Sequence, residues 1–171
     1  MVRLLIERDP TLYFSVSAKT RAPRPGEVDG RDYWFINEDR FDELVSNDAF
    51  LEWASMFGHR SGTLAEPVDR ARAEGRDVIL EIDVQGARQI RDRMPDAVLI
   101  FLAPPTREEL LRRLRTRGTE QGEDLDLRLD AIDRELAQAR WFDHVVVNDD
   151  LSRAAGEVAD IIERHRGATK P

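Results

Sequence analysis

The sequence contains no cysteine, and its only lysines are Lys19 and Lys170. The lack of cysteine excludes a disulfide framework, a thiolate zinc site and a cysteine nucleophile. No apolar run approaches the roughly 20 residues of a membrane-spanning helix, and the first residues hold no apolar core typical of a signal peptide. We therefore expect a cytoplasmic protein that does not enter a membrane.

A chain of 171 residues is long enough for one sizeable α/β domain, and we expect a single domain over residues 1–171. Acidic residues outnumber basic ones by 34 to 26, which argues against a nucleic-acid-coating function but leaves a small anionic substrate open. Nearly all the basic residues are arginines, whose planar guanidinium groups bind phosphate and carboxylate in pairs. For most of these arginines, compositional bias explains the count equally well.

Short apolar runs alternate with helical patterns along the chain. The pattern predicts strands at 12–16, 32–36, 50–57, 78–83, 98–102 and 145–147. It predicts helices before Pro10, after Asn37, at 67–75 and 85–93, after Thr106, up to about 140, and at 151–166. This alternation is typical of a doubly wound parallel sheet, and the region 33–63 reads as an antiparallel insertion.

A loop after the first strand carries Arg21 and Arg24, and Pro23 and Pro25 keep it from forming helix. Two rigidly spaced guanidinium groups at the carboxyl end of a strand suit a phosphate dianion, although a solvated basic loop would have the same composition. Tyr33 would either add a hydroxyl donor or pack as a half-buried strand residue.

Three carboxylates occur within or directly after apolar strands, namely Glu52, Glu81 and Asp83. They could accept hydrogen bonds from N–H groups of a ligand, or help hold Mg²⁺ through water. The alternatives are an outward-facing strand position for Glu52 and the N-cap of the following helix for Asp83.

Residues 107–117 contain five arginines. These cannot all lie on one face of a helix, so most of them must be solvated. Arg113 and Arg117 are spaced i,i+4, and Arg128 follows across a charged segment. These three could close over a polyphosphate and stabilise charge on a transferring phosphoryl group. The three histidines show no metal-binding spacing.

Several segments occur in the order found in guanylate kinases: 14–17 (FSVS), 20–27 (TRAPRPGE), 30–33 (GRDY), 51–54 (LEWA), 81–86 (EIDVQG), 117–120 (RGTE) and 147–150 (VNDD). The chain resembles that family essentially from end to end. The resemblance implies a P-loop kinase-like α/β fold with a GMP-binding insertion (about 18–31 and 33–65) and a helical lid (about 113–128). It implies phosphorylation of GMP to GDP by ATP with Mg²⁺ in purine metabolism, by a monomer or small homo-oligomer that binds no nucleic acid.

The resemblance also implies roles for individual residues. The GMP phosphate would be bound by Arg21, Arg24 and Tyr33, and the guanine by Ser17, Glu52, Thr63 and Asp83. The ATP phosphates would be contacted by Arg113, Arg117 and Arg128, with Asn148 on the adenine side and Glu81 near the metal through water. Carboxylates opposite the guanine N–H groups would explain discrimination against adenine.

Two features depart from the family pattern. Ser61 stands where many members have a tyrosine, so one phosphate contact loses its phenol. The phosphate loop G-x-x-x-x-G-K-[ST] does not occur, since Lys19 follows Ala18 and Lys170 follows Thr169. Residues 1–5 align just after that loop, so we expect an amino-terminal truncation that removes the loop and the first core strand, roughly 20 residues.

Without the loop we expect a very poor kinase. A start codon assigned too late would explain the gap, and the upstream DNA would then encode the motif. The alternative is a non-catalytic guanylate-kinase-like module that binds phosphorylated peptides. The missing loop favours that alternative, whereas Arg113, Arg117 and Arg128 argue against it. A GMP sensor without turnover ranks last.

Overall fold

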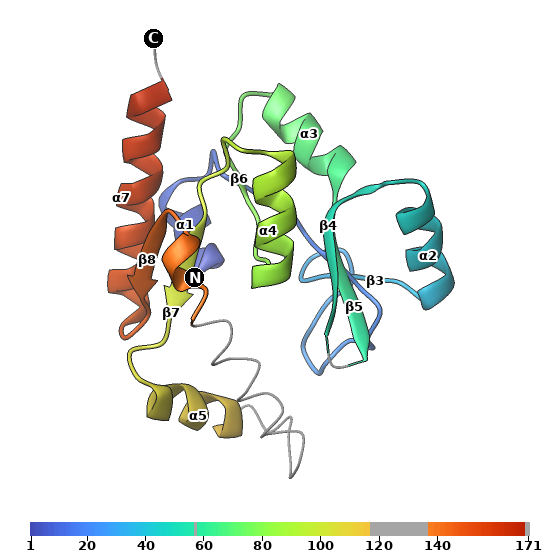
Figure 1. Ribbon diagram of the computed structural model, residues 1–171, viewed down its shortest axis with the longest axis horizontal. Coiled ribbons are helices and arrows are strands. Elements are labelled where there is room, and N and C mark those ends of the chain that lie inside the picture. The colour runs from blue at the N-terminus through green and yellow to red at the C-terminus, as the bar shows by residue number, and fades with distance from the viewer. Residues whose placement is uncertain (57, 117–136, 170–171) are drawn as a thin grey trace. The chain divides into compact units, whose positions relative to one another are not determined.

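The computed structural model describes residues 1–56, 58–116 and 137–169 (Figure 1). Its contacts divide the chain into two compact units, residues 2–97 and residues 98–171 with Met1, and each is described by itself. The unit 2–97 contains α1 (Val2–Arg8), β1 (Tyr13–Phe14), β2 (Ala18–Lys19), β3 (Trp34–Phe35), α2 (Glu38–Ser46), β4 (Phe50–Met56), β5 (His59–Leu64), α3 (Ala65–Ala73), β6 (Val78–Ile79) and α4 (Val84–Arg93).

A four-stranded sheet in the order β3-β2-β5-β4 dominates this unit. The strands β4 and β5 form an antiparallel hairpin, and β5 also pairs antiparallel with β2. These pairs confirm the expected antiparallel insertion for β4 and β5, and the departure from it is the pair β2–β3, which is parallel. The physical reason is the long connection over residues 20–33, which carries the chain back across the sheet before β3 begins.

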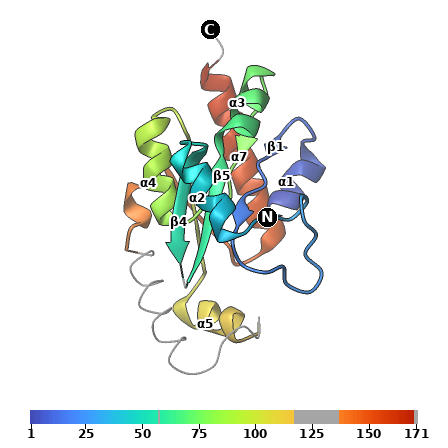
Figure 2. The same cartoon turned by 90° about the vertical axis from the view of Figure 1, so that its right-hand side faces the viewer.

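Helix α2 covers one face of this sheet, and Figure 2 shows it in front of β4 and β5. The Asn37 side chain caps the helix by accepting from the Arg40 N–H, as the sequence predicts. Phe41 is fully buried, stacks on Phe50 with ring centroids 4.6 Å apart, and packs with Ala18. This apolar layer leaves the other face of the sheet to polar residues.

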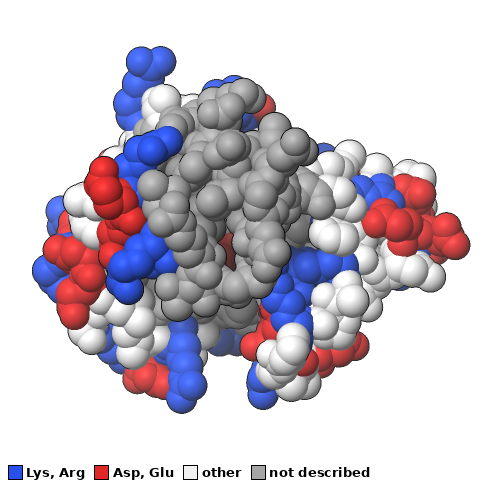
Figure 3. All heavy atoms as spheres, turned by 90° about the horizontal axis from the view of Figure 1, so that it is seen from below, with Lys and Arg blue, Asp and Glu red and all other residues white. Residues whose placement is uncertain are grey.

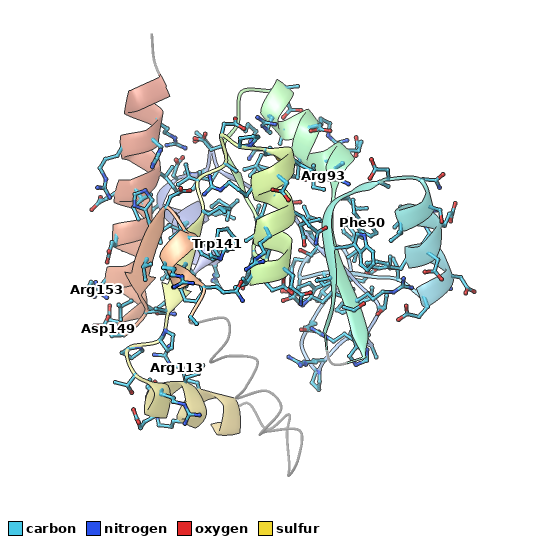
Figure 4. The ribbon with its side chains drawn as sticks, in the orientation of Figure 1. Phe50, Arg93, Arg113, Trp141, Asp149 and Arg153 are labelled. Carbon is cyan, nitrogen blue, oxygen red and sulfur yellow. The ribbon has the colours of Figure 1, made fainter. Side chains whose placement is uncertain are left out.

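Helix α4 covers the outer edge of β4 (Figure 4). The Gln89 amide donates to the Trp53 carbonyl at 2.7 Å and accepts from the Trp53 N–H at 3.2 Å. The Arg93 guanidinium donates to the Phe50 carbonyl at 2.7 Å and to Asp48 at 2.8 Å. Side chains of one helix therefore satisfy the backbone groups that an edge strand exposes.

The parallel strands of the unit 2–97 form a short pair, in which Tyr13 lies opposite Val78 and Phe14 opposite Ile79. The expected strands 12–16 and 78–83 are thus shorter in the structure, because only these residues pair between them. The expected strand 32–36 is likewise reduced to Trp34–Phe35, the residues of β3 that pair with β2. Helix α4 begins at Val84, as expected within one residue.

The unit 98–171 contains β7 (Ile100–Ala103), α5 (Arg107–Thr116), a 3₁₀ turn η1 (Ala139–Trp141), β8 (His144–Val147) and α7 (Leu151–Thr169). β7 and β8 are parallel, with Phe101 opposite Val145. Thr106 caps α5 by accepting from the Glu109 N–H at 3.1 Å, and the Glu109 carboxylate accepts from Arg112 and Arg113. Among the described helices, none has both the length and the apolar character needed to cross a membrane.

Of the helix expected up to about 140, the structure describes only the last residues, where η1 begins. Most of the expected lid, 113–128, lies outside the described residues, which resume at 137.

Candidate functional site

The register of the four-stranded sheet separates an apolar face from a polar face. Ala18, Gly62 and Trp53 lie opposite one another on the α2 side. Because successive residues of a strand point to opposite faces, the neighbouring positions lie on the other side. That side carries Ser17, Lys19, Tyr33, Phe35, Glu52, Ser61 and Thr63. We call this set the polar face, and it includes four of the residues predicted to bind GMP.

The loop after β2 positions Arg21 through an acidic residue of the same loop. Arg21 Nη1 and Nη2 donate to the two carboxylate oxygens of Glu27 at 2.6 and 2.7 Å, and the Arg24 backbone N–H donates to the same carboxylate at 2.7 Å. The hydrogen bonds from Arg21 are the main cause that lowers the pKa of Glu27 to about 2. Glu27 therefore stays ionised and holds the Arg21 guanidinium in one orientation.

Tyr33 lies beneath two cations. The Lys19 ammonium is 4.0 Å from the centroid of the Tyr33 ring, and the Arg21 guanidinium is 5.3 Å from it. Burial, followed by the negative charge of Glu81, raises the pKa of Tyr33, so its hydroxyl keeps its proton and can donate. The structure thus brings Arg21, Tyr33 and a lysine together at one end of the polar face.

At another position on this face, Glu52 and Thr63 form a buried pair. The Thr63 hydroxyl donates to Glu52 Oε1 at 2.7 Å, and the two residues are 5% and 1% exposed. Burial is the main cause that raises the pKa of Glu52, and the nearby Asp83 carboxylate raises it further. A buried carboxylate can accept several hydrogen bonds, so this position suits a ligand N–H donor.

Asp83 and Gly86 fix the other side of this pocket. Asp83 is the N-cap of α4, where Oδ1 accepts from the Gly86 N–H at 2.8 Å. The N-cap role, which was the alternative for Asp83, is thereby confirmed. A Cβ atom on Gly86 would collide with Glu52 Oε2, so the first turn of α4 approaches the carboxylate at a distance that only glycine permits.

Glu81 follows β6, is exposed, and lies near enough to influence Lys19 and Tyr33 electrostatically. Over residues 1–56, 58–116 and 137–169, no three His, Asp or Glu residues cluster as a metal site. Mg²⁺ in phosphoryl transfer is usually held by one or two carboxylates, water and substrate phosphates. A single exposed carboxylate fits that donor set only through water and with a nucleotide present.

In the unit 98–171, Arg113 projects from α5 and donates through Nε to Glu109 at 2.7 Å (Figure 4). Arg112 binds the same carboxylate, and its hydrogen bonds are the main cause that lowers the pKa of Glu109 to about 2. Asn148 is anchored through its backbone N–H to the Ala103 carbonyl at 2.7 Å. Arg117 and Arg128 lie outside the described residues.

Reasoning from the sequence missed three contributors to the polar face, namely Lys19, Glu27 and Gly86. The i,i+2 spacing of Ser17 and Lys19 on one strand would have placed the lysine on this face. The Arg21–Glu27 contact spans a loop whose path no periodicity predicts. The need for glycine at position 86 depends on how α4 packs against β4.

Comparison with known proteins shows the family of this chain. The family model "Guanylate kinase" matches residues 1–165. A guanylate kinase of Mycobacterium sp. (strain MCS) is 51% identical over 170 residues, covering 98% of this chain and 86% of its own length. One from Mycobacterium tuberculosis (strain CDC 1551 / Oshkosh) is 52% identical over 164 residues, covering 95% and 79%.

Among solved structures, the crystal structure of guanylate kinase from Anaplasma phagocytophilum matches with a TM-score of 0.82 at 32% identity. The match covers 95% of this chain and 79% of that one. The α/β fold expected from the resemblance, that of the P-loop kinases, is thereby confirmed. Because the family model spans residues 1–165 and the mycobacterial relatives share about half of their aligned residues with this sequence, the chain belongs to the guanylate kinase family.

Proposed function

We propose that this chain binds GMP on the polar face and acts in its phosphorylation to GDP by ATP, in the purine metabolism of the cytoplasm. The observation that carries the proposal is the polar face itself. It joins a buried carboxylate–hydroxyl pair, Glu52 and Thr63, to a cationic loop that Glu27 has already ordered.

The guanine would be read by Glu52, Thr63, Ser17 and Asp83. Guanine presents N1–H and N2–H donors, and adenine presents an unprotonated N1 in the corresponding place. A buried carboxylate facing that nitrogen would meet a second acceptor if adenine entered, so the wrong base leaves Glu52 without a donor. The second oxygen of Asp83 is the acceptor that remains after its first has capped α4.

The phosphate of GMP would be held by Arg21, Arg24 and Tyr33. A phosphate dianion accepts several charge-assisted hydrogen bonds, and Arg21 can offer them without further ordering because Glu27 already fixes it. The acceptor oxygen of this phosphate would then attack the γ-phosphorus of ATP, and the bond to the ADP oxygen would break.

On the donor side, Arg113, Arg117 and Arg128 would neutralise the charge on the transferring phosphoryl group, with Asn148 near the adenine. Mg²⁺ would supply further neutralisation of the ATP phosphates, and Glu81 would contact it through water. The printed sequence contains no G-x-x-x-x-G-K-[ST] motif. We therefore assign no residue of this chain to the phosphate-loop role, and we propose that the chain supplies the GMP site and the arginines on the donor side.

On the face shown in Figure 3, basic and acidic side chains of the described residues are interspersed. The excess of acidic over basic residues in the sequence, 34 against 26, supports a small nucleotide, in preference to a nucleic acid, as the partner.

Calorimetric titration with GMP, AMP and guanosine tests the proposal. We expect GMP to bind at least about 100-fold more tightly than AMP. Arg24→Ala should weaken GMP binding about tenfold and leave guanosine binding unchanged, because Glu27 contacts only the Arg24 backbone. Arg40→Ala, which removes an exposed arginine on α2, is the matched control.

Equal affinity for AMP and GMP would refute the assignment of the base site. A phosphorylated peptide that binds more tightly than GMP would favour the non-catalytic module. ADP release, followed in a coupled assay with Mg²⁺ and ATP, then measures the residual turnover.

A further inference from the structure

Lys19 belongs to the polar face and lies on β2, between β3 and β5. It lies opposite Phe35 on β3 and opposite Ser61 on β5, while its neighbour Ala18 packs into the apolar core. The side chain is half-buried, and its ammonium group lies 4.0 Å from the Tyr33 ring centroid. The position of Lys19 is therefore fixed by a β-ladder on each side.

The charges around Lys19 leave an excess of one cation. The charged groups that act on it are Arg21, Arg24, Glu27 and Glu81, and Tyr33 is the neutral group beneath it. Glu27 is already bound to both terminal nitrogens of Arg21. The cations Lys19, Arg21 and Arg24 thus outnumber the two carboxylates, and the carboxylate of Glu27 is already bound to Arg21.

The Lys19 ammonium has three donors and no acceptor. Among the described residues, the Lys19 ammonium contacts the Tyr33 ring and forms no hydrogen bond or ion pair. Burial lowers the pKa of Lys19, and the positive charge of Arg21 lowers it further, so the ammonium is both desolvated and crowded by a like charge. An anion placed between Lys19 and Arg21 would relieve both effects.

We propose that Lys19 is a third cation of the phosphate site, and that its ammonium binds the 5′-phosphate dianion of the nucleotide beside Arg21 and Arg24. This inference rests on the proposed function and deepens it. A purely structural role, in which Lys19 only packs on the Tyr33 ring, makes different predictions for ligands with and without phosphate.

Variants at position 19 separate the two roles. Lys19→Met keeps the length of the chain and removes the charge, and we expect it to weaken GMP binding about tenfold while guanosine affinity stays within about twofold of wild type. Lys19→Arg should restore GMP binding to within about threefold of wild type. Arg40→Met deletes a cation on α2, on the opposite side of the sheet, and should leave both affinities unchanged.

Unchanged GMP binding by Lys19→Met would overturn the proposal, as would an equal loss of GMP and guanosine binding. If the wild-type protein binds guanosine and AMP as tightly as GMP, the proposed function fails. That result is distinct from a failure of the role of Lys19.

A second measurement follows the lysines of the wild-type protein directly. The sequence has only two lysines, so protein labelled with ¹⁵N at the lysine side chains gives at most two ammonium signals. We expect GMP and inorganic phosphate to shift and sharpen one of them, and guanosine to leave both in place. Lys19→Arg assigns the signal. If neither signal changes its position or width at a saturating concentration of GMP, Lys19 does not bind the phosphate.

Discussion

Both terminal nitrogens of Arg21 donate to the carboxylate of Glu27, at 2.6 and 2.7 Å. The side chains are only 13% and 19% exposed, so this pair is better shielded from solvent than most ion pairs of the described residues. The contact closes the loop on itself before any ligand arrives. A phosphate that binds Arg21 therefore meets a guanidinium whose orientation has already been fixed.

Glu27→Gln should lower the free energy of unfolding at pH 7 by about 1 to 2 kcal/mol, because a shielded bidentate pair becomes a neutral contact. The folded state lowers the pKa of Glu27 from 4.5 to about 2. The stabilisation is therefore complete above about pH 4.5 and is lost as the pH falls through about 2. Urea unfolding at pH 7, 4 and 2.5 should show the difference from wild type shrinking.

The matched control for this series is Glu66→Gln, which removes an exposed pair with Arg70 and should change stability by less than about 0.5 kcal/mol. A Glu27→Gln difference that stays constant down to pH 2.5 would contradict the role of this ion pair.

Glu52→Gln should raise the stability of the fold at pH 7 and lower the affinity for GMP. Burial raises the pKa of Glu52, so its ionised form destabilises the fold at neutral pH, and this cost fades as the pH falls and the carboxyl is protonated. The amide variant should be about 1 kcal/mol more stable at pH 7, with the gain disappearing at acidic pH. GMP affinity should fall at least about 100-fold, measured by calorimetry.

Glu43→Gln, on the exposed surface of α2, is the comparison for Glu52→Gln and should alter neither quantity appreciably. A Glu52→Gln protein that is less stable at pH 7 and still prefers GMP to AMP would show that the buried carboxylate neither strains the fold nor reads the base.

Gly86→Ala should destabilise the protein, although alanine has the higher helix propensity. Alanine in a helix usually stabilises by up to about 1 kcal/mol relative to glycine, but here the new Cβ would collide with Glu52 Oε2. We expect a lower melting temperature and weaker GMP binding, because Glu52 must move. Gly167→Ala in α7, where a Cβ has open space, should raise the melting temperature slightly or leave it unchanged. A stabilised Gly86→Ala protein with normal GMP affinity would disprove the close packing.

Gln89→Ala should leave the N–H and carbonyl of Trp53, on the edge strand β4, without their side-chain partner. Gln89 satisfies both backbone groups of Trp53, so its loss should cost about 1 to 2 kcal/mol of unfolding free energy and promote association through the exposed edge. Urea unfolding and light scattering measure the two effects. Gln85→Ala, one turn earlier on an exposed position of α4, should change neither. If the two variants behave alike, the Gln89 amide contributes nothing to the edge.

Much of the local structure could be predicted because it depends on neighbours in sequence. Asn37 and Thr106 cap α2 and α5 through backbone groups three residues away, and such contacts need no tertiary context. The strands 12–16 and 78–83 were predicted too long, because an apolar run does not reveal how many of its residues find a partner. Asp83 kept two possible roles until the structure showed it at the start of α4.

The sequence by itself determined the family, the candidate site residues and the absence of the G-x-x-x-x-G-K-[ST] motif, since these are properties of residue order alone. Only the tertiary structure decided that Lys19 joins Arg21 over Tyr33, and that Glu52 meets Thr63 against Gly86. The physical reason is that the contacts of Lys19 with Tyr33, and of Glu52 with Thr63 and Gly86, join residues that are distant in sequence. Strand register and helix packing, which set those distances, are not encoded in any short segment.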